Sequence, residues 1–265
     1  MTGSEGAAEN RTQRPADATA SLFFRHVAPL TPQAHGSLGL VDPLRYDFAR
    51  PTNVIPLNAV EFLAACRHYP IVFNVDAMGE PLAMVGVRGH LNLFVEPDGN
   101  WAEGCYIPAF VRRHPFVLTS DGGKAIALCV DAESPLIRKG GNRPFFEQGR
   151  PTELTRRVAE FCAAFAREQA KTRGFVRRLQ ALDLLVERAV DIRQAGGERL
   201  AFRGVRVVDE AAFRRLPEAV VLEFWKEGWL GLVHAHLASL GNFGRLFNRS
   251  RRPGQAAQGV NPSRT

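Results

Sequence analysis

The sequence has no uninterrupted run of 18 apolar residues, so it predicts no helix that crosses a membrane. Its most apolar stretch, residues 220–240, is broken by charged side chains and two histidines. The first 21 residues lack the basic start and apolar run of a signal peptide, so we expect a soluble, cytoplasmic protein. The four cysteines lie far apart and form no CxxC pair, which predicts reduced thiols and no metal site.

Lysine is scarce, and positive charge is unevenly spread. The net charge is +7, and only four of the 34 basic residues are lysines. Residues 245–265 contain five arginines and no acidic residue, whereas residues 1–21 are slightly acidic. The region between them therefore has little excess charge with which to follow a phosphate backbone. This distribution disfavours nucleic acid as a partner but leaves open binding through the arginine-containing tail.

Sequence motifs typical of enzymes are also missing. The chain contains no GxGxxG, P-loop or HExxH motif. The GSLG string at residues 36–39 is not a hydrolase GxSxG turn, because His35 stands at the first glycine position. Cys66 and His68 are two positions apart near an expected helix end, where they would meet only if the helix frayed. The sequence thus predicts no cofactor and no metal, and it favours binding over catalysis.

Composition divides the chain into three parts. Residues 1–21 and 248–265 contain scarcely any large apolar side chain, so we expect both ends to be disordered around one folded region at residues 22–247. The first half of that region is rich in proline, glycine and short apolar runs, which predicts antiparallel hairpins. The second half predicts a long helix, a hairpin and a C-terminal helix. The fold class is therefore α+β, with residues 132–150 as a loop between the halves.

A weak repeat occurs in the first half at an offset of 45 residues. RHYPIVF at residues 67–73 aligns with RRHPFVL at residues 112–118. Each segment follows a short apolar stretch and precedes a strand, a turn and a second strand, so the repeated unit is a helix, a proline corner and a hairpin. We expect the units at residues 57–88 and 107–130 to lie in one sheet. A further strand is expected at residues 91–95, followed by a turn at residues 97–100.

The long helix is expected to begin near Thr152, which follows a proline and can cap the first amides. Large apolar residues recur every three or four positions from Leu154 to Leu182, in a heptad-like seam. Such a seam must pack on something. It can cover the protein's own sheet and second helix, or it can bind a helix of a partner or of another copy.

The second half continues with a hairpin at residues 187–208, a short helix capped by Asp209 and a last helix from Pro217 to about Leu240. On a regular helix, His236 falls on the apolar side with Trp225 and Trp229, whereas His234 falls on the opposite side. We therefore expect His236 to be a buried, hydrogen-bonded histidine and His234 to be exposed. The two imidazoles point apart and cannot hold one metal ion from such a helix.

Several longer strings resemble a known family. The first half contains NVIPL at 53–57, YPIVF at 69–73, NLFV at 92–95 and YIPAFVRRHPF at 106–116, and the second half contains VVDE at 207–210 and LASLGN at 237–242. Over about residues 24–247 the chain resembles the SapC family of bacterial proteins, named from a surface-layer locus and distinct from the membrane-spanning transporter permease of the same name. The family leads us to expect an acidic loop at residues 131–150, but here residues 136–147 read LIRKGGNRPFFE.

The resemblance implies an accessory role more than a reaction, because members are often encoded near outer-membrane receptors and have no accepted catalytic residues. It implies a protein or peptide partner within a surface-layer or outer-membrane uptake system. Alternatives are a partner-dependent modifying enzyme using the Arg112/His114 corner and a nucleic-acid binder using the tail. The candidate binding residues are polar and aromatic positions at corners, where such side chains can equally satisfy backbone groups: Asn53, Arg67, Asn92, Trp101, Tyr106, Arg112 and His114.

Overall fold

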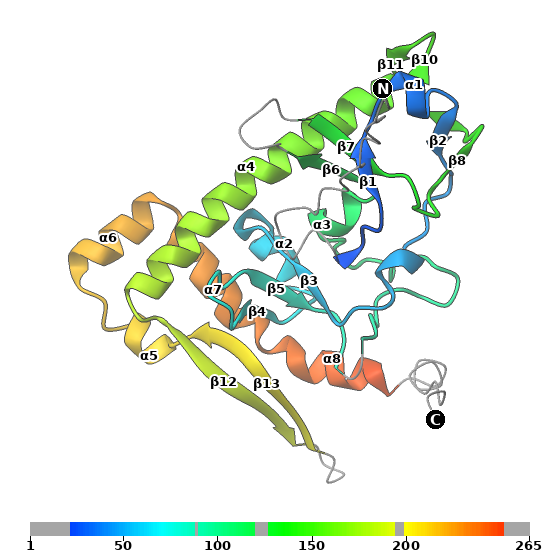
Figure 1. The fold of residues 1–265 in the computed structure, drawn as a ribbon. Helices are drawn as coiled ribbons and strands as arrows, with labels where there is room; N and C mark the ends of the chain where they lie inside the picture. Colours follow the sequence, from blue (N-terminus) through cyan, green and yellow to red (C-terminus); the bar gives the residue numbers. More distant parts are fainter. Residues whose placement is uncertain (1–21, 88–89, 120–126, 194–198, 252–265) are drawn as a thin grey trace, which may run out of the picture.

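The computed structural model describes residues 22–87, 90–119, 127–193 and 199–251. Helices and antiparallel sheets alternate along the chain, which confirms the predicted α+β class (Figure 1). The largest sheet has five strands in the order β12-β13-β4-β5-β3, and every registered pair in it is antiparallel. Its strands are β3 (Val54–Pro56), β4 (Ile71–Asn74), β5 (Pro81–Met84), β12 (Leu185–Arg193) and β13 (Arg199–Val208).

Smaller antiparallel sheets form the other end of the molecule. One has the order β1-β7-β6 and another has the order β8-β2-β9, while β10 and β11 pair only with each other. The strands are β1 (Val27–Pro29), β2 (Leu38–Leu40), β6 (Phe116–Thr119), β7 (Ala127–Asp131), β8 (Ile137–Lys139), β9 (Arg143–Pro144), β10 (Phe146–Glu147) and β11 (Arg150–Pro151). The loop expected at residues 132–150 thus contains three short strands and the first residue of a fourth, β11.

Short helices connect these strands. They are α1 (Pro32–His35), η2 (Asp47–Ala49), η3 (Ala59–Glu61), α2 (Phe62–Ala65) and α3 (Ala109–Arg112). The α2 and α3 helices each lead through a proline corner, at Pro70 and Pro115, into a hairpin. The repeated unit is therefore confirmed. The expectation of one shared sheet is wrong, because β4 and β5 pair with β13 and β3 whereas β7 pairs with β1.

Residues 91–95 do not form the expected strand. Only Val95 pairs with Trp101, in an isolated bridge around the turn at residues 97–100. Gly99 closes that turn with a φ of 82°, and its amide donates to the Glu96 carbonyl at 2.8 Å. The segment is held by single backbone hydrogen bonds, such as the one from the Leu93 amide to the Val85 carbonyl at 2.9 Å, and by the Asn92 side chain, which donates to the Ala49 carbonyl and accepts from the Phe94 amide. Leu93, Phe94 and Val95 are buried nonetheless, without the ladder partner that a strand requires.

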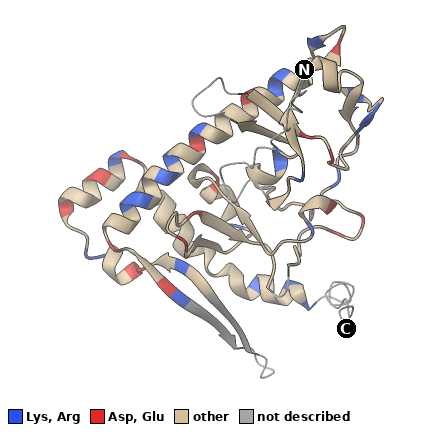
Figure 2. Ribbon diagram, viewed as in Figure 1, with Lys and Arg blue, Asp and Glu red and all other residues tan. Residues whose placement is uncertain are grey.

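The long helix α4 (Glu153–Ala181) confirms the predicted start, with Thr152 Oγ1 accepting from the Thr155 amide at 3.4 Å. It runs along one side of the molecule and contains both basic and acidic residues, with basic residues alone after Glu168 (Figures 1 and 2). Its seam divides into two halves. Phe175 and Leu179 are fully buried in the main core, whereas Leu154, Val158 and Phe161 are only partly buried. The first half of the seam thus remains accessible.

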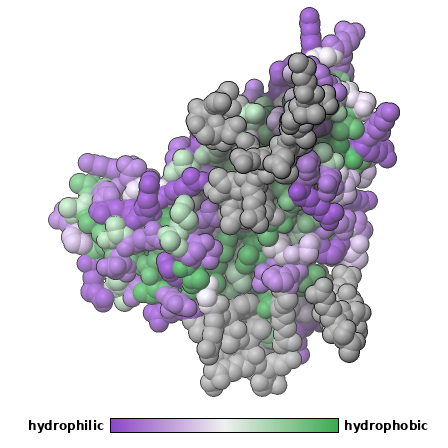
Figure 3. Space-filling view, in the orientation of Figure 1, coloured by the Kyte–Doolittle hydropathy of each residue, from purple (hydrophilic) through white to green (hydrophobic). Residues whose placement is uncertain are grey.

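The C-terminal region contains four helices: α5 (Glu210–Phe213), α6 (Glu218–Lys226), α7 (Trp229–Ser239) and α8 (Asn242–Ser250). The prediction of a single helix at residues 217–240 is wrong, because Gly228 adopts a left-handed φ of 71° and separates α6 from α7. This break takes Trp225 out of register with α7, so Trp225 is 71% exposed on α6 and not buried beside His236. Val221 and Leu222 of α6 are exposed as well, and Figure 3 shows hydrophobic residues on the surface at the end of the molecule where α6 lies. The α8 helix also carries the described structure past residue 247.

The predicted roles of the two histidines of α7 are confirmed, with His236 buried and His234 exposed. The Val208 amide donates to His236 Nε2 at 3.0 Å, so Nδ1 carries the proton and donates to the Ile71 carbonyl at 2.9 Å. One side chain thereby ties α7 to both β13 and β4. Burial lowers the pKa of His236 to about 4, and its hydrogen bond to the Ile71 carbonyl only partly offsets this effect.

Candidate functional site

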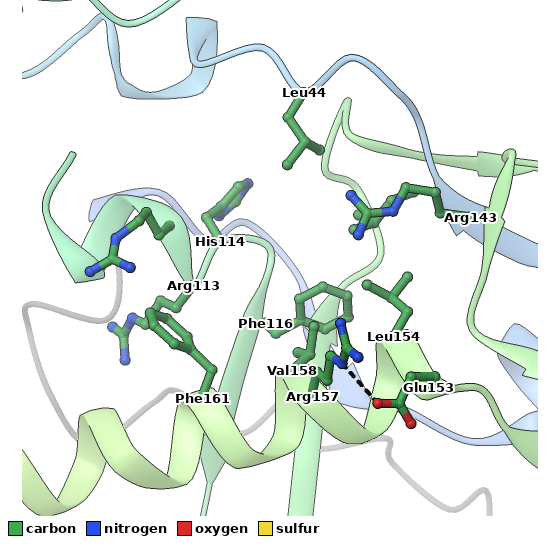
Figure 4. Close-up of a pocket in the computed structure, with 12 residues that line it drawn as sticks. Leu44, Arg113, His114, Phe116, Arg143, Glu153, Leu154, Arg157, Val158 and Phe161 are labelled. Carbon is green, nitrogen blue, oxygen red and sulfur yellow. Dashed lines mark hydrogen bonds and ion pairs between the residues drawn. The ribbon is translucent and has the colours of Figure 1, made fainter. Parts of the chain in front are cut away.

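A cavity of about 480 Å³ lies between the first half of α4, the corner from α3 to β6, and the strands β2 and β9 (Figure 4). Twelve residues line it: Leu40, Leu44, Arg112, Arg113, His114, Phe116, Arg143, Glu153, Leu154, Arg157, Val158 and Phe161. They come from segments more than 100 residues apart in the sequence. The walls combine apolar side chains with four arginines and a single acidic residue.

The apolar part of the wall is the accessible half of the α4 seam together with the β2 and β6 strands. Leu154 and Val158 pack against a small core cluster that includes Leu40 and Phe116. This cluster is separate from the main core, which contains the second half of the seam. The apolar floor of the cavity is therefore packed against this small cluster before any ligand binds.

Two arginines reach into the open space of the cavity from different elements. Arg143 extends from β9 and Arg157 extends from α4, and both guanidinium groups point toward the same opening (Figure 4). Arg157 Nε donates to Glu153 Oε1 at 2.7 Å. Among the residues that the structure describes, no carboxylate pairs with Arg143. One rim arginine thus shares its charge with Glu153, while the other is available to an anion.

A third arginine, Arg112, is held in place before any ligand arrives. Its Nε donates to the Ile107 carbonyl at 3.0 Å, and its Nη2 donates to the Tyr106 hydroxyl at 3.2 Å. Its guanidinium carbon also lies 5.2 Å from the centre of the Phe161 ring. These contacts leave Nη1 unused and fix the plane of the guanidinium.

Behind Arg112 lies the buried carboxylate of Glu61. Its Oε1 accepts from the Tyr106 hydroxyl at 2.9 Å and from the Ala109 amide at 2.7 Å, and its Oε2 accepts from the Asn58 amide at 2.9 Å. Burial raises the pKa of Glu61, while these hydrogen bonds and the nearby Arg112 lower it. Burial, followed by the Glu61 charge, raises the pKa of Tyr106 to about 12. The Tyr106 hydroxyl therefore stays protonated and links the buried acid to the arginine at the rim.

His114 forms part of the cavity wall but is only 5% exposed. Its ring stacks on Phe48 with centroids 4.1 Å apart, and its Nε2 lies 3.0 Å from Ser134 Oγ. Its Nδ1 has no hydrogen-bond partner among the described residues. The pKa of His114 is lowered to about 4, mainly by burial; the nearby Asp131 raises it in part, and Arg113 makes a smaller lowering contribution. At neutral pH His114 is therefore an uncharged imidazole with one unsatisfied nitrogen.

The structure brings together three of the seven residues singled out from the sequence, namely Tyr106, Arg112 and His114. Asn92 and Trp101 have structural partners elsewhere. Asn92 Nδ2 donates to the Ala49 carbonyl at 3.0 Å, and Trp101 Nε1 donates to Tyr69 Oη at 3.0 Å. Both side chains are buried, so they stabilise the fold around the turn at residues 97–100.

Asn53 and Arg67 also lie outside the cavity lining. The backbone carbonyl of Asn53 accepts from the Val85 and Gly86 amides at 2.8 and 3.1 Å, so its position belongs to the edge of the five-stranded sheet. Arg67 is exposed after α2, and its charge helps to lower the pKa of His68, for which burial is the main cause. Neither residue has a geometric link to Arg112 or His114.

Sequence reasoning missed Arg143, Arg157 and Glu61. Arg143 lies in the basic segment noted as a departure from the family pattern, which was the only sequence signal for it. Arg157 faces the cavity because it lies one helical turn after Glu153 and one before Phe161 on α4. Glu61 looks like an ordinary helix acid in the sequence, and only its burial distinguishes it.

Three further observations concern other kinds of site in the described part of the chain. No group of three or more histidine, cysteine, aspartate or glutamate side chains there could hold a metal ion. None of the helices described is long and apolar enough to span a membrane. Arg249 of the arginine-containing tail donates to the Leu93 carbonyl and the Glu96 carboxylate, both at 2.6 Å, so it is already engaged by the fold.

The cavity and the antiparallel sheets define an α+β protein with a basic rim around an apolar floor. The SapC family model matches residues 30–246, which is most of the chain. The chain therefore belongs to the SapC family, as its sequence strings indicated. Neither the curated proteins nor the solved structures contain a match.

Proposed function

We propose that this SapC-family protein is a binding factor that holds a segment of a protein or peptide partner in the cavity beside α4. The observation that carries the proposal is the apolar floor under a rim of arginines. An apolar side chain gains free energy by leaving water for that floor, and an adjacent acidic group can pair with Arg143 and Arg157. A place in a surface-layer or outer-membrane uptake system is consistent with such a role and is part of the proposal.

A chain-like ligand is favoured over a compact small molecule by what borders the cavity. A second, more polar hollow of about 880 Å³ shares Arg143, Glu153 and Leu154 with it and continues past Thr152 and Arg150. A polypeptide can bury a side chain in the apolar cavity while its backbone lies along the polar hollow. The partly exposed seam residues on α4 then have a partner to pack against.

The enzyme alternative has one supporting observation, the contact between His114 and Ser134. A serine nucleophile activated by histidine needs a hydroxyl that the substrate can reach. Ser134 is 4% exposed and does not line the cavity, and its hydroxyl already accepts from the Leu136 amide at 3.3 Å. This arrangement suits a structural hydrogen bond better than acyl transfer, so we favour binding.

A defined peptide library tests the proposal. Synthetic heptapeptides are passed over the immobilised full chain, and retained sequences are identified and measured by titration calorimetry. We expect enrichment of peptides that combine an apolar residue with an acidic group, and at least tenfold weaker binding to Leu154→Asp. Arg167→Gln, at an exposed position of the same helix, is the matched control and should bind like the wild type. Equal retention by wild type and Leu154→Asp would contradict the proposal.

A further inference from the structure

The cavity places its anion-binding groups and its apolar floor so close together that they constrain which part of a peptide fits. Arg143 and Arg157 line the same cavity of about 480 Å³ as Leu154 and Phe116, and Figure 4 shows the four side chains around one open space. A ligand must therefore present a negative charge and an apolar group from nearly the same point. This requirement goes beyond a general preference for acidic and apolar residues.

An internal peptide segment meets this requirement poorly. In an extended chain, successive side chains point to opposite faces, so an acidic residue and its apolar neighbour cannot both enter one cavity. Residues two positions apart share a face, but their Cα atoms are separated by about 6.5 Å. The last residue of a chain is different, because its α-carboxylate and its side chain diverge from one Cα atom.

We infer that the cavity binds the carboxyl terminus of a partner polypeptide that ends in a large apolar residue. This inference rests on the proposed function and specifies its ligand. The terminal carboxylate pairs with Arg143 and Arg157, and the terminal side chain packs on Leu154, Val158 and Phe116. The preceding residues leave along the polar hollow beside Thr152.

The charge distribution of the site supports a terminal carboxylate. Arg143 has no carboxylate partner among the described residues, and Arg157 is paired only through Nε, with Glu153, so its terminal nitrogens can still donate. His114 is uncharged at neutral pH and does not compete with the arginines for the anion. The lining contains four arginines and one acidic residue, so it has a net positive charge that is complementary to a carboxylate.

A fatty acid has the same two features, a carboxylate and an apolar body. Its tail, however, would leave the polar hollow of about 880 Å³ without a ligand, whereas a peptide backbone can use the hydrogen-bonding groups there. The surface thus fits a peptide terminus better than a lipid. Dodecanoate serves below as the probe for the other source of this chemistry.

Paired peptide pools test the inference. Two pools of heptapeptides with the same random sequences, each ending in Leu, Phe or Val, are prepared with free and with amidated carboxyl termini. They are incubated with the full chain, and bound peptides are quantified by mass spectrometry, with dodecanoate as competitor in a third arm. We expect the free-acid pool to bind at least tenfold better than the amidated pool, because amidation removes a charge-assisted pair.

Variants locate the effect. Arg143→Gln should remove most of the difference between free-acid and amidated peptides, whereas Arg138→Gln, which changes an exposed arginine on strand β8 of the same sheet, should preserve it. If both pools bind equally and Leu154→Asp weakens both, the cavity binds peptides but not termini, and only this inference is overturned. If neither pool binds, the proposed function is overturned as well. Saturable dodecanoate binding without peptide binding would assign the cavity to a lipid instead.

Discussion

The Tyr106 hydroxyl donates to the buried Glu61 carboxylate at 2.9 Å and accepts from Arg112 on its other side. A carboxylate that is 4% exposed is thereby connected to an exposed arginine at the cavity rim through one hydroxyl group. Buried acids are costly unless they are fully hydrogen-bonded. The network satisfies Glu61 and at the same time fixes the orientation of Arg112, so fold stability and the geometry of the site depend on the same side chain.

Tyr106→Phe should lower the free energy of unfolding by about 1 to 3 kcal/mol, because Glu61 Oε1 loses one of its two donors. Urea denaturation monitored by circular dichroism measures the change. Tyr46→Phe is the matched control, since the described contacts of the partly buried Tyr46 include no hydrogen bond from its hydroxyl. A loss of the same size in both variants would show that the Glu61 network contributes nothing specific.

Acid should destabilise the protein through its buried histidines. The pKa of His236 is about 4 in the folded chain, below the ordinary histidine value of about 6.5. Between these two pKa values the unfolded chain binds more protons than the folded chain. The contribution of His236 to the free energy of unfolding is therefore greatest above about pH 6.5 and decreases as the pH falls toward 4. Each such histidine makes the free energy of unfolding change by up to about 1.4 kcal/mol per pH unit in this range.

The His236 contribution can be isolated with His236→Gln, which carries no titratable group. Chemical denaturation at several pH values from 7 to 4.5 should give a shallower dependence for this variant than for the wild type, even though it is less stable at pH 7. His234→Gln changes an exposed residue and should keep the wild-type slope. An unchanged slope in His236→Gln would contradict the assignment of a neutral, buried imidazole.

Gly228→Ala should destabilise the protein by about 1 kcal/mol, because an L-residue with a side chain is strained at a φ of 71°. Gly231→Ala is the internal comparison. Gly231 lies inside α7, and a Cβ atom there has nothing within 4 Å, so alanine should stabilise the helix by about 0.5 to 1 kcal/mol. Thermal melts that give both variants the same sign would contradict the break between α6 and α7.

The two halves of the α4 seam should respond differently to truncation. Leu179→Ala removes a fully buried side chain and should cost about 3 kcal/mol or more of unfolding free energy. Leu154→Ala, at a partly buried position over the cavity, should cost less than about 1.5 kcal/mol. Equilibrium denaturation of both variants measures the difference. Similar losses would show that the cavity wall is part of the rigid core.

Local features of the fold could be predicted because their causes are local. Pro70 and Pro115 end helical segments and start strands, Thr152 caps α4, and Asp209 accepts from the amides of Ala211 and Ala212. The heptad spacing of α4 likewise follows from a single periodicity. The predicted start of α4 near Thr152, for example, agrees with the observed first helical residue, Glu153.

The choice of strand partners could not be predicted, because two similar hairpins offer the same patterns to any edge strand. Trp225 was misplaced for a different reason, since a left-handed glycine inside an apolar stretch leaves no mark in a helical wheel. The candidate site was found in part through the Arg112/His114 corner. Its other half, Arg143 and Arg157, depends on tertiary contacts between β9 and α4 that no local pattern encodes.

The division of α4 has a consequence for how this protein can evolve. Most substitutions at Phe175 or Leu179 destabilise the fold and are selected against, because these side chains belong to the main core. Changes at Leu154 or Val158 alter the wall of the cavity, because these side chains pack against the separate small cluster and not against the main core. New ligand preferences can therefore arise by mutation at two positions of α4 while the contacts of its second half with the main core stay the same.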